Sequence, residues 1–557
     1  MFFRQKRSGK HVYLQIVENR WEDGRSKQRV ITTLGRLDEL REQGRLDGLL
    51  RSGAKFSQAA LLLTAQQKGE LPVISTRRLG PELIFERLWS ELKIPQVLEG
   101  LLGGRRFEFP VERAVFLTVI HRLFHSGSDR SCMVWKKDYH LPGTESLQLH
   151  QLYRAMAWLG EPLGDDEQDG ATPFAPRCVK DQIEEGLFHR RRDLFSELAL
   201  VFYDTTSIYF EGRGGETLGQ YGHSKDHRPD RLQMVVGVVL DGSGRPLCCE
   251  LWPGNITDVK TLLPIVDRLR KRFAICSVCV VADRGMISQH TIEELQSQER
   301  GVHYILGARL RSVKEIREKV LSHPGRYREV RGPKTKSDDP APLQVKNVSI
   351  GERRYVVCLN VDQAKKDKAD RAAIVAALAE QLKQGDKSLV GNRGYRKYLK
   401  GSATHFEIDR RKIKAEARYD GKWVLRTDLD DLSAEDVALR YKQLWMVEDC
   451  IRSIKSILES ILETRPIYHH HDETIRGHVF CSFLALVLRK ELQDRLTDAG
   501  HQAEWADVLR DLEALQWVEV EHQQKRFRLR SEARGLCSQV LQAVGVAFPP
   551  TLEQCID

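Results

Sequence analysis

Long apolar runs are missing from this 557-residue sequence. No stretch of about eighteen uncharged apolar residues is available to span a bilayer. The N-terminus, MFFRQKRSGKHVYLQIV, carries basic residues but lacks the uninterrupted apolar segment of a secretory signal. These absences predict a cytoplasmic protein with no membrane partner. The hydrophobic fraction of 41% and charged fraction of 30% are typical of globular proteins, and the length predicts about three or four folded units.

Paired cysteine motifs of the zinc-binding kind are also missing. Most of the eleven cysteines lie in apolar stretches, as is typical of reduced thiols in the cytosol. Cys276 and Cys279 form one CxxC, but no second CxxC or HxxxH lies nearby, so we expect a buried strand there. The triple histidine at 469–471 is expected to be a polar loop between helices, with metal binding as the less favoured interpretation.

Negative charge does not balance positive charge in this chain. The net charge of +10 favours a polyanionic partner such as nucleic acid. Basic residues cluster in four short segments that would serve phosphate contact, although such clusters are ordinarily solvated surfaces. The clusters span residues 189–193, 268–272, 409–414 and 525–530.

Periodicity divides the chain into regions of different character. The first forty residues alternate apolar and polar positions around a turn signal at Asp23-Gly24, which predicts a hairpin. Helical periodicity dominates from about residue 80 to 159, and the Gly-, Pro- and Asp-rich segment 163–177 is typical of a domain boundary. The expected regions are an N-terminal β-rich region (1–78) and a helical region (79–165), either of which is suited to DNA binding, a mixed α/β core (178–310), a β-rich insertion (311–432), core helices (433–495) and a helical C-terminal tail (496–557).

Two aspartates end apolar strands of the predicted core. Asp204 follows the apolar run ELALVFY, and Asp283 follows CSVCVVA. Polar groups at the ends of neighbouring strands can converge on one point of a sheet edge. Each aspartate alone is more often a turn residue than a metal ligand, so a third group is needed to define a site.

A third carboxylate, Glu448, is predicted on a long helix that starts at Ser433 with the pattern of a capping box. Tyr441, Glu448 and Lys455 recur every seven residues, which places them together beside the apolar stripe. We therefore expect Glu448 to be half buried at the edge of a groove. The apolar stripe comprises Val437, Leu444, Val447, Ile451, Ile454, Leu458 and Ile461.

Three converging carboxylates repel one another unless cations compensate them. Oxygen-only ligation suits Mg²⁺ or Mn²⁺ and disfavours zinc. Two such ions about 3.5–4 Å apart would support an in-line displacement at a phosphodiester. Lys455 would then neutralise a phosphate, and Tyr441 would stack or form a hydrogen bond nearby.

These segments resemble the transposases of bacterial insertion sequences that carry a DDE site. The similar motifs are YDTTS around Asp204, VVADRG around Asp283, and a Tyr441-x2-Leu444-x3-Glu448-x6-Lys455 pattern close to the Y-x2-R-x3-E-x6-K signature of the insertion-sequence-four group. Leu444 stands where that signature has arginine. Further similarity lies in YGHSKDHRPDRLQ (221–233) and GNITD (254–258), and the resemblance spans about residues 201–488.

The resemblance implies an RNase H-like mixed-sheet core in a multidomain α/β protein that cuts the ends of its own element and joins the 3′-hydroxyls to target DNA. It implies that Asp204, Asp283 and Glu448 hold two Mg²⁺ or Mn²⁺ ions, and that a homodimer pairs the two element ends. Two alternatives stay open: a hydrolytic nuclease on the same fold, and a DNA-binding protein without catalysis. The residues expected to contact DNA are Tyr441, Arg452, Lys455, Arg284 and Arg465.

Overall fold

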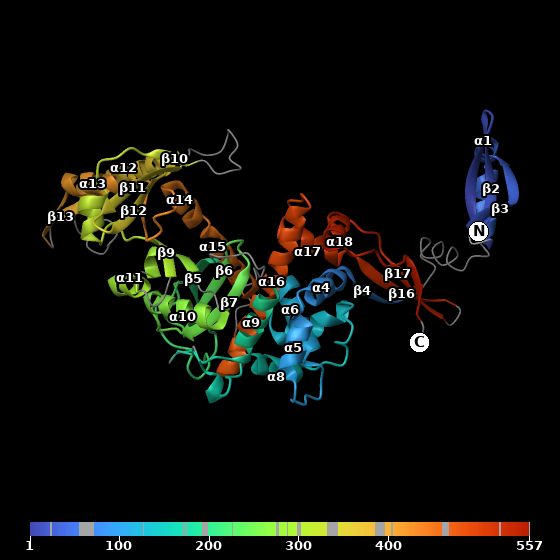
Figure 1. The fold of residues 1–557 in the computed structure, drawn as a ribbon, viewed down its shortest axis with the longest axis horizontal. Helices are drawn as coiled ribbons and strands as arrows, with labels where there is room; N and C mark the ends of the chain where they lie inside the picture. Colours follow the sequence, from blue (N-terminus) through green and yellow to red (C-terminus); the bar gives the residue numbers. More distant parts are fainter. Residues whose placement is uncertain are drawn as a thin grey trace. The chain divides into compact units, whose positions relative to one another are not determined.

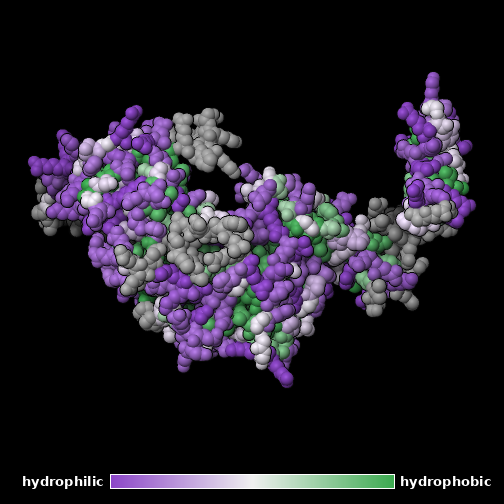
Figure 2. All heavy atoms as spheres, viewed as in Figure 1, coloured by the Kyte–Doolittle hydropathy of each residue, from purple (hydrophilic) through white to green (hydrophobic). Residues whose placement is uncertain are grey.

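The computed structural model is drawn in Figure 1, and it forms two compact units. One comprises Met1–Gly80, Arg510–Cys537 and Ala547–Asp557, and the other comprises Pro81–Leu509 and Ser538–Val546. No helix in the described part of the chain is long and apolar enough to cross a membrane. The face seen in Figure 2 is largely hydrophilic, with only small apolar patches. The structure describes all residues except 23–24, 55–71, 126, 170, 173–174, 192–198, 226, 274–277, 287, 298–301, 331–342, 385–395, 403–404, 459–466, 523–524 and 556–557.

The first unit begins with an antiparallel sheet of β1 (Phe2–Ser8), β2 (His11–Glu22) and β3 (Arg25–Arg36). Pairing of Glu22 with Arg25 confirms the predicted hairpin, whose turn residues Asp23 and Gly24 lie outside the described part. Leu14 of β2 packs against Leu37 and Leu40 of α1 (Leu37–Glu42), which α2 (Arg45–Ala54) follows.

The C-terminal region, expected to be helical, also contains strands. Helices α17 (Trp505–Glu513) and α18 (Cys537–Val544) flank a hairpin of β16 (Gln516–His522) and β17 (Lys525–Arg530). This hairpin joins β4 (Val73–Arg78) and β18 (Leu552–Gln554) in a four-stranded sheet. The physical reason is the two-residue alternation of QWVEVEH and KRFRLR, which buries Val520, Phe527 and Leu529 on one face.

Helices of the second unit confirm the helical periodicity found up to residue 159. The long helix α16 (Asp472–Asp498) packs against α6 and α8. Because neighbours surround α6, its residues from Ala114 to Leu123 are all buried. These helices are α4 (Gly80–Glu91), α5 (Ile94–Leu102), α6 (Val111–Phe124), α7 (Asp129–Trp135), α8 (Leu149–Leu159) and α9 (Val179–Arg191).

A nine-stranded mixed sheet forms the centre of the second unit. Five of its strands lie in the order β9-β8-β5-β6-β7, with β8 parallel to both β5 and β9, and β6 antiparallel to its neighbours β5 and β7. This order and these directions are those of an RNase H-like core, as expected from the sequence. The strands are β5 (Ala199–Tyr209), β6 (Gln233–Asp241), β7 (Pro246–Pro253), β8 (Val278–Ala282) and β9 (Val302–Gly307).

Helices cover both faces of this core sheet (Figure 1). Val201 and Tyr203 of β5 belong to a buried apolar cluster with residues of α10 (Leu262–Phe273) and α11 (Gln289–Leu295). Because side chains alternate along a strand, Phe202 and Asp204 face the opposite side. The helix α15 (Trp445–Leu458) contacts β5 and β6.

The insertion extends the core sheet instead of forming a separate one. Strand β15 (Lys422–Thr427) pairs with β9, and β12 (Arg353–Leu359), β11 (Leu343–Ile350) and β10 (Arg328–Val330) follow outward. The region is rich in strands, as expected. Its remaining elements are α12 (Val361–Gln384), the hairpin of β13 (Leu399–Ser402) and β14 (His405–Ile408), and α13 (Arg410–Glu416).

The prediction of a single long helix from Ser433 is wrong, because the structure has two helices there. Ser433 caps α14 (Ala434–Lys442) as expected, its hydroxyl accepting the Asp436 amide at 3.0 Å. The helix then ends, and the Leu444 amide donates to the Tyr441 carbonyl, three residues back, before α15 starts at Trp445. The two helices pack on different strands: α14 contacts β8 to β12, and α15 contacts β5 and β6.

Candidate active site

Asp204 and Asp283 lie side by side on two parallel strands, Asp283 directly after the end of β8 and Asp204 within β5. Strand β5 continues to Tyr209 by pairing with β6, so the expectation that Asp204 ends its strand is wrong. The last paired positions of β5 and β8 are Tyr203 and Ala282, and each aspartate is the next residue along its strand. Parallel neighbours in register present their side chains to the same face. The expected convergence of these two carboxylates follows from this register.

Asp204 is half-buried, and its surroundings disfavour a bare negative charge. Burial raises the pKa of Asp204 to about 6, with further contributions from the charges of Asp283 and Asp258. Lys225 and the Thr205 amide, which donates to Oδ1 at 2.7 Å, oppose this rise only in part. A cation bound at this position would relieve the remaining cost of ionisation.

Asp283 opens onto a cleft of about 560 Å³ that also holds Tyr441 and Glu448. The Tyr441 hydroxyl donates a hydrogen bond to Asp283 Oδ1 at 3.1 Å. Three residues singled out from sequence therefore share one cavity, although α14 and α15 are separate helices. Other residues lining the cleft include Leu310, Arg311, Tyr419, Lys422, Lys442, Leu444 and Trp445.

Glu448 is exposed, so the expectation of a half-buried side chain is wrong. The break after α14 puts Glu448 in the first turn of α15, where the helix dipole favours a negative charge, instead of in mid-helix. Among described residues, the carboxylates of Asp204, Asp283 and Glu448 do not form a group with ligand atoms all within 4.8 Å. The structure thus places the two aspartates together and Glu448 on the wall of the same cleft as Asp283.

The remaining residues expected to contact DNA are only partly described. Arg452 and Lys455 follow Glu448 on α15, and Arg284 directly follows Asp283, but their side chains lie outside the described part. Arg465 lies outside it entirely. Leu444, at the signature's arginine position, is buried at 6% exposure. Arg311, Lys422 and Lys442 supply cationic side chains along the same cleft.

Two charged residues near the aspartates were not assigned a role from the sequence. Lys225 forms an ion pair with Asp258 at 3.2 Å, and the Thr205 hydroxyl donates to Asp258 at 2.8 Å. Both residues lie in segments that carried the family resemblance, so the signal was present. Their pairing was not predictable, because 33 residues separate them and no local period connects them.

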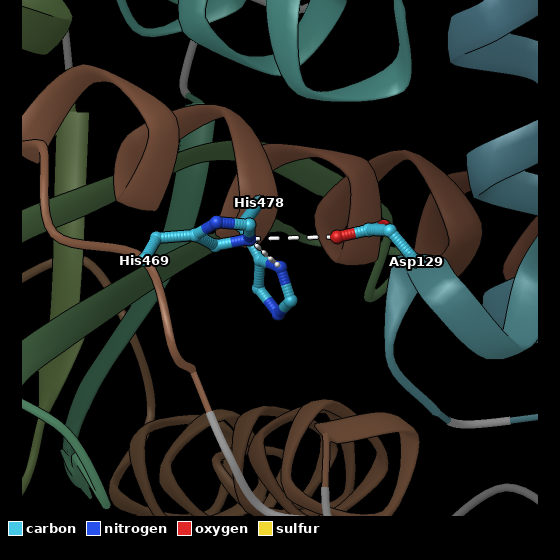
Figure 3. A group of neighbouring side chains, drawn as sticks. All are labelled: Asp129, His469 and His478. Carbon is cyan, nitrogen blue, oxygen red and sulfur yellow. Dashed lines mark hydrogen bonds and ion pairs between the residues drawn. The ribbon is translucent and has the colours of Figure 1, made fainter. Parts of the chain in front are cut away.

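One described group has the spacing of a metal site, and it lies elsewhere. The group consists of Asp129 of α7, His478 of α16 and His469 of the loop before α16. Their side chains point toward one another (Figure 3). His469 Nε2 lies 3.1 Å from His478 Nδ1 and 3.5 Å from Asp129 Oδ2. His469 is therefore not part of a simple polar loop, as we expected for the triple histidine. His470 and His471 are exposed, as that interpretation requires.

A divalent cation is disfavoured in this histidine cluster because the positive charge of Arg122 already neutralises the Asp129 carboxylate. The Arg122 guanidinium lies 2.9 Å from His478 Nδ1 and 3.4 Å from Asp129 Oδ1. Although burial opposes it, His469 and Arg122 hold the pKa of Asp129 below its usual range, and burial lowers that of His478. Imidazole ligands also disfavour Mg²⁺. We assign the cluster a structural role.

Two arginines of the basic segment 268–272 are not available for the phosphate contacts considered for it, whereas Lys271 of the same segment is exposed. Arg268 and Arg272 are buried, and both pair with Glu250. Arg272 also pairs with Glu184 at 2.9 Å. Phe273 and other apolar positions of α10 draw this face of the helix into the core, so these two arginines serve internal ion pairs.

Comparisons with known proteins agree with the family indicated by the residues. Residues 196–465 match the family model described as Transposase DDE domain, and residues 3–67 match IS1634 family transposase, N-terminal domain. Together the two matches cover more than half of the chain. No curated protein sequence matches it.

Two solved structures are similar at low identity. One is the piggyBac transposase synaptic complex with hairpin DNA, with 11% identity, a TM-score of 0.37 and 78% of each chain covered. Another is the Drosophila P element transposase strand transfer complex, with 13% identity, a TM-score of 0.21, and 73% of this chain and 87% of that chain covered. At these TM-scores the likeness carries no weight, and the fold assignment rests on strand order and register.

The strand order, the placement of the two aspartates and the family matches define a DNA transposase of the DDE class. The chain belongs to the DDE transposases of bacterial insertion sequences, and its N-terminal region matches the IS1634 family. Membership of this class makes it a DNA-cleaving and strand-transfer enzyme, and such enzymes generally use divalent metal ions.

Proposed function

We propose that Asp204, Asp283 and Glu448 hold two Mg²⁺ or Mn²⁺ ions, with which the chain cuts the ends of its own element and joins the 3′-hydroxyls to target DNA. The observation that carries this proposal is the register of β5 and β8, which sets Asp204 beside Asp283, together with the contact of α15 with the strand of Asp204. Glu448, from the first turn of α15, lines the same cleft as Asp283.

The residues present fit these ions. The donor set consists of carboxylate oxygens, which Mg²⁺ and Mn²⁺ prefer. Burial and neighbouring charge raise the pKa of Asp204, so its ionised form gains from a bound cation. When bound, two such ions supply activation of the attacking oxygen and stabilisation of the leaving oxygen at the phosphodiester.

The side chains around the carboxylates orient Asp283 and bind the DNA backbone. Tyr441 donates to Asp283 Oδ1 and so fixes the direction of that carboxylate. Lys442, Lys422 and Arg311 line the cleft and would hold the DNA backbone. We also propose phosphate contacts for the other basic residues expected to bind DNA, which are Arg452, Lys455, Arg284 and Arg465.

Glu448 must approach the aspartates for this chemistry. Without a cation, like charges favour separation of the three carboxylates, and an exposed Glu448 side chain keeps its hydration. Glutamate has three rotatable bonds, and α15 already contacts β5, the strand of Asp204. We infer that Glu448 turns into the site when the ions and DNA bind.

Recognition of the element ends is assigned to the N-terminal regions, 1–78 and 79–165. Strands β1 to β3 expose many basic side chains, and antiparallel strands can enter a DNA groove. Two ends processed together need two active sites, which supports a homodimer. The exposed basic residues of these strands and their turns include Lys6, Arg7, Lys10, Arg25, Lys27 and Arg29.

A joining assay separates this function from its two rivals. A labelled duplex carrying the terminal sequence of the chain's own element is incubated with plasmid target DNA and Mg²⁺, Mn²⁺ or EDTA. Metal-dependent nicks together with labelled plasmid support the transposase. Nicks without joined plasmid favour a hydrolytic nuclease, and binding without nicks in either metal favours a non-catalytic DNA-binding protein.

A further inference from the structure

We propose that Lys225 is a positioning residue for the aspartate pair, which it supports by neutralising Asp258, a fourth carboxylate beside Asp204 and Asp283. This inference rests on the proposed function of these aspartates. Lys225 Nζ lies 3.2 Å from Asp258 Oδ2, 2.6 Å from the Thr205 carbonyl oxygen and 3.0 Å from Thr205 Oγ1. The Thr205 hydroxyl in turn donates to Asp258 Oδ1 at 2.8 Å.

These contacts join Lys225 and Asp258 to the strand that carries Asp204. Thr205 directly follows Asp204, and successive side chains of a strand point to opposite faces. Although the Thr205 side chain points away from that of Asp204, the charges of Lys225 and Asp258 still act on the Asp204 carboxylate: Lys225 lowers its pKa and Asp258 raises it. The Lys225 amide also donates to Ser207 Oγ at 2.8 Å, which fixes the lysine's own backbone to the same strand.

Asp258 also lies close to the turn that follows Asp283. A Cβ built on Gly285, two residues after Asp283, would stand 3.8 Å from Asp258 Oδ2, and the 3-10 turns at 258–260 and 284–286 are in contact. The ion pair thus lies between the residues that follow Asp204 and Asp283. Both oxygens of Asp258 are engaged by Lys225 and Thr205, so this carboxylate is a support and not a third ligand.

Glycines bring the two supporting segments together. A Cβ on Gly222 would collide with the Gly254 carbonyl oxygen, and one on Gly254 would collide with the Gln233 carbonyl oxygen. The Gly254 amide donates to the Leu218 carbonyl at 3.1 Å. This close backbone approach, which a side chain would prevent, sets the loop of Lys225 against the loop of Asp258.

Removal of the lysine charge is expected to leave Asp258 free to compete for metal. Lys225→Met should therefore bind Mn²⁺ at least as tightly as wild type, because a nearby positive charge is lost, yet cut DNA 10–100-fold more slowly at saturating metal and DNA. Lys225→Arg, which keeps the charge but changes the shape and geometry of the donors, should cut DNA faster than Lys225→Met. The KM for DNA should change by less than about 3-fold.

A double-mutant cycle tests the route of this effect. Full-length wild type, Lys225→Met, Asp258→Asn and the double variant are compared for end cleavage and for Mn²⁺ binding by calorimetry. We expect Lys225→Met to cost less than about 3-fold in the Asp258→Asn background. An equal cost in both backgrounds, or a loss of Mn²⁺ affinity that parallels the loss of cleavage, would overturn the proposal.

Three further measurements separate this proposal from its alternatives. If Lys225→Met unfolds at a lower temperature than wild type, and Lys225→Arg cleaves DNA no faster than Lys225→Met, the lysine has a merely structural role. That result would contradict the proposal. A raised KM for DNA would indicate a phosphate contact, also against it. The Asp204→Asn variant is assayed in parallel. If it cleaves DNA at the wild-type rate, the proposed function itself is rejected.

Discussion

The Tyr441 hydroxyl donates to Asp283 Oδ1 at 3.1 Å and thereby ties the last turn of α14 to the end of strand β8. A hydrogen bond to a charged group contributes roughly 1.5–3 kcal/mol when buried and less when half exposed. Tyr441→Phe should therefore slow metal-dependent cleavage about 5–20-fold with little change in DNA affinity. Tyr419→Phe is the matched control, because Tyr419 lines the same cleft and its contact with Arg311 uses the ring. Equal activity of Tyr441→Phe and wild type would contradict an orienting role.

Asp204 carries a stability cost at neutral pH that its proposed role as a metal ligand requires. Its folded-state pKa is raised from 3.8 to about 6, so the protonated form is favoured by folding. The associated stability is present below about pH 4, and it is lost as pH rises through 6. At pH 7.5 Asp204→Asn should unfold a few degrees higher than wild type, which corresponds to on the order of 2–3 kcal/mol.

The Asp204→Asn comparison has two internal checks. At pH 4.5 the gain should shrink, because the wild-type carboxyl is then protonated. Added Mg²⁺ should raise the unfolding temperature of wild type and not that of the variant. Asp169→Asn, at an exposed carboxylate, serves as the control and should show neither effect. A variant less stable than wild type at pH 7.5 would contradict this account of Asp204.

The strands that carry Asp204 and Asp283 could be predicted from the sequence because the relevant signals are local. Apolar runs before Asp204 and Asp283 define two buried strands, and the parallel pairing of these strands then brings the two aspartates together. The helix carrying Glu448 was predicted with the wrong length, because the break at Gln443-Leu444 contains neither Gly nor Pro. That break arises from α14 and α15 packing on different strands, which is a tertiary effect.

Contacts between distant segments were beyond the reach of local patterns. The ion pair of Lys225 with Asp258 and the cluster of Asp129, His469 and His478 each join segments that only the fold brings together. The arginines of segment 268–272 illustrate the reverse error. A basic run indicates a solvated surface, yet Arg268 and Arg272 face inward with α10's apolar residues and pair with buried acids.

Acidification should destabilise the fold through its buried histidines. Burial and Arg122 lower the pKa of His121 to about 3 and that of His478 well below its usual value. The unfolded chain binds these protons below about pH 6.5 while the folded chain does not, so stability falls as pH drops. Between pH 7 and pH 5 the unfolding temperature of wild type should fall by more than that of His478→Gln. Equal losses in the two proteins would contradict the assignment of a neutral, buried His478.

Arg272 and Lys271 provide a matched pair of basic residues in one cluster. The Arg272 side chain is 2% exposed and pairs with Glu184, Glu185 and Glu250, whereas Lys271 is 53% exposed. Breaking a buried pair costs about 3–5 kcal/mol, so Arg272→Ala should lower the unfolding temperature markedly. Lys271→Ala should shift stability by less than about 0.5 kcal/mol. An Arg272→Ala protein that keeps wild-type stability but loses DNA affinity would contradict this assignment and indicate that Arg272 contacts DNA.

The most direct test of the carboxylate site is the cleavage rate of a labelled element-end duplex in Mg²⁺, measured for wild type, Glu448→Gln and Asp283→Asn with DNA binding recorded on the same samples. The site as described predicts that both variants bind the duplex as wild type does and cut it at least 10³-fold more slowly, roughly 4 kcal/mol of lost stabilisation. Cleavage by Glu448→Gln at the wild-type rate would contradict it, because the third ligand would then lie elsewhere.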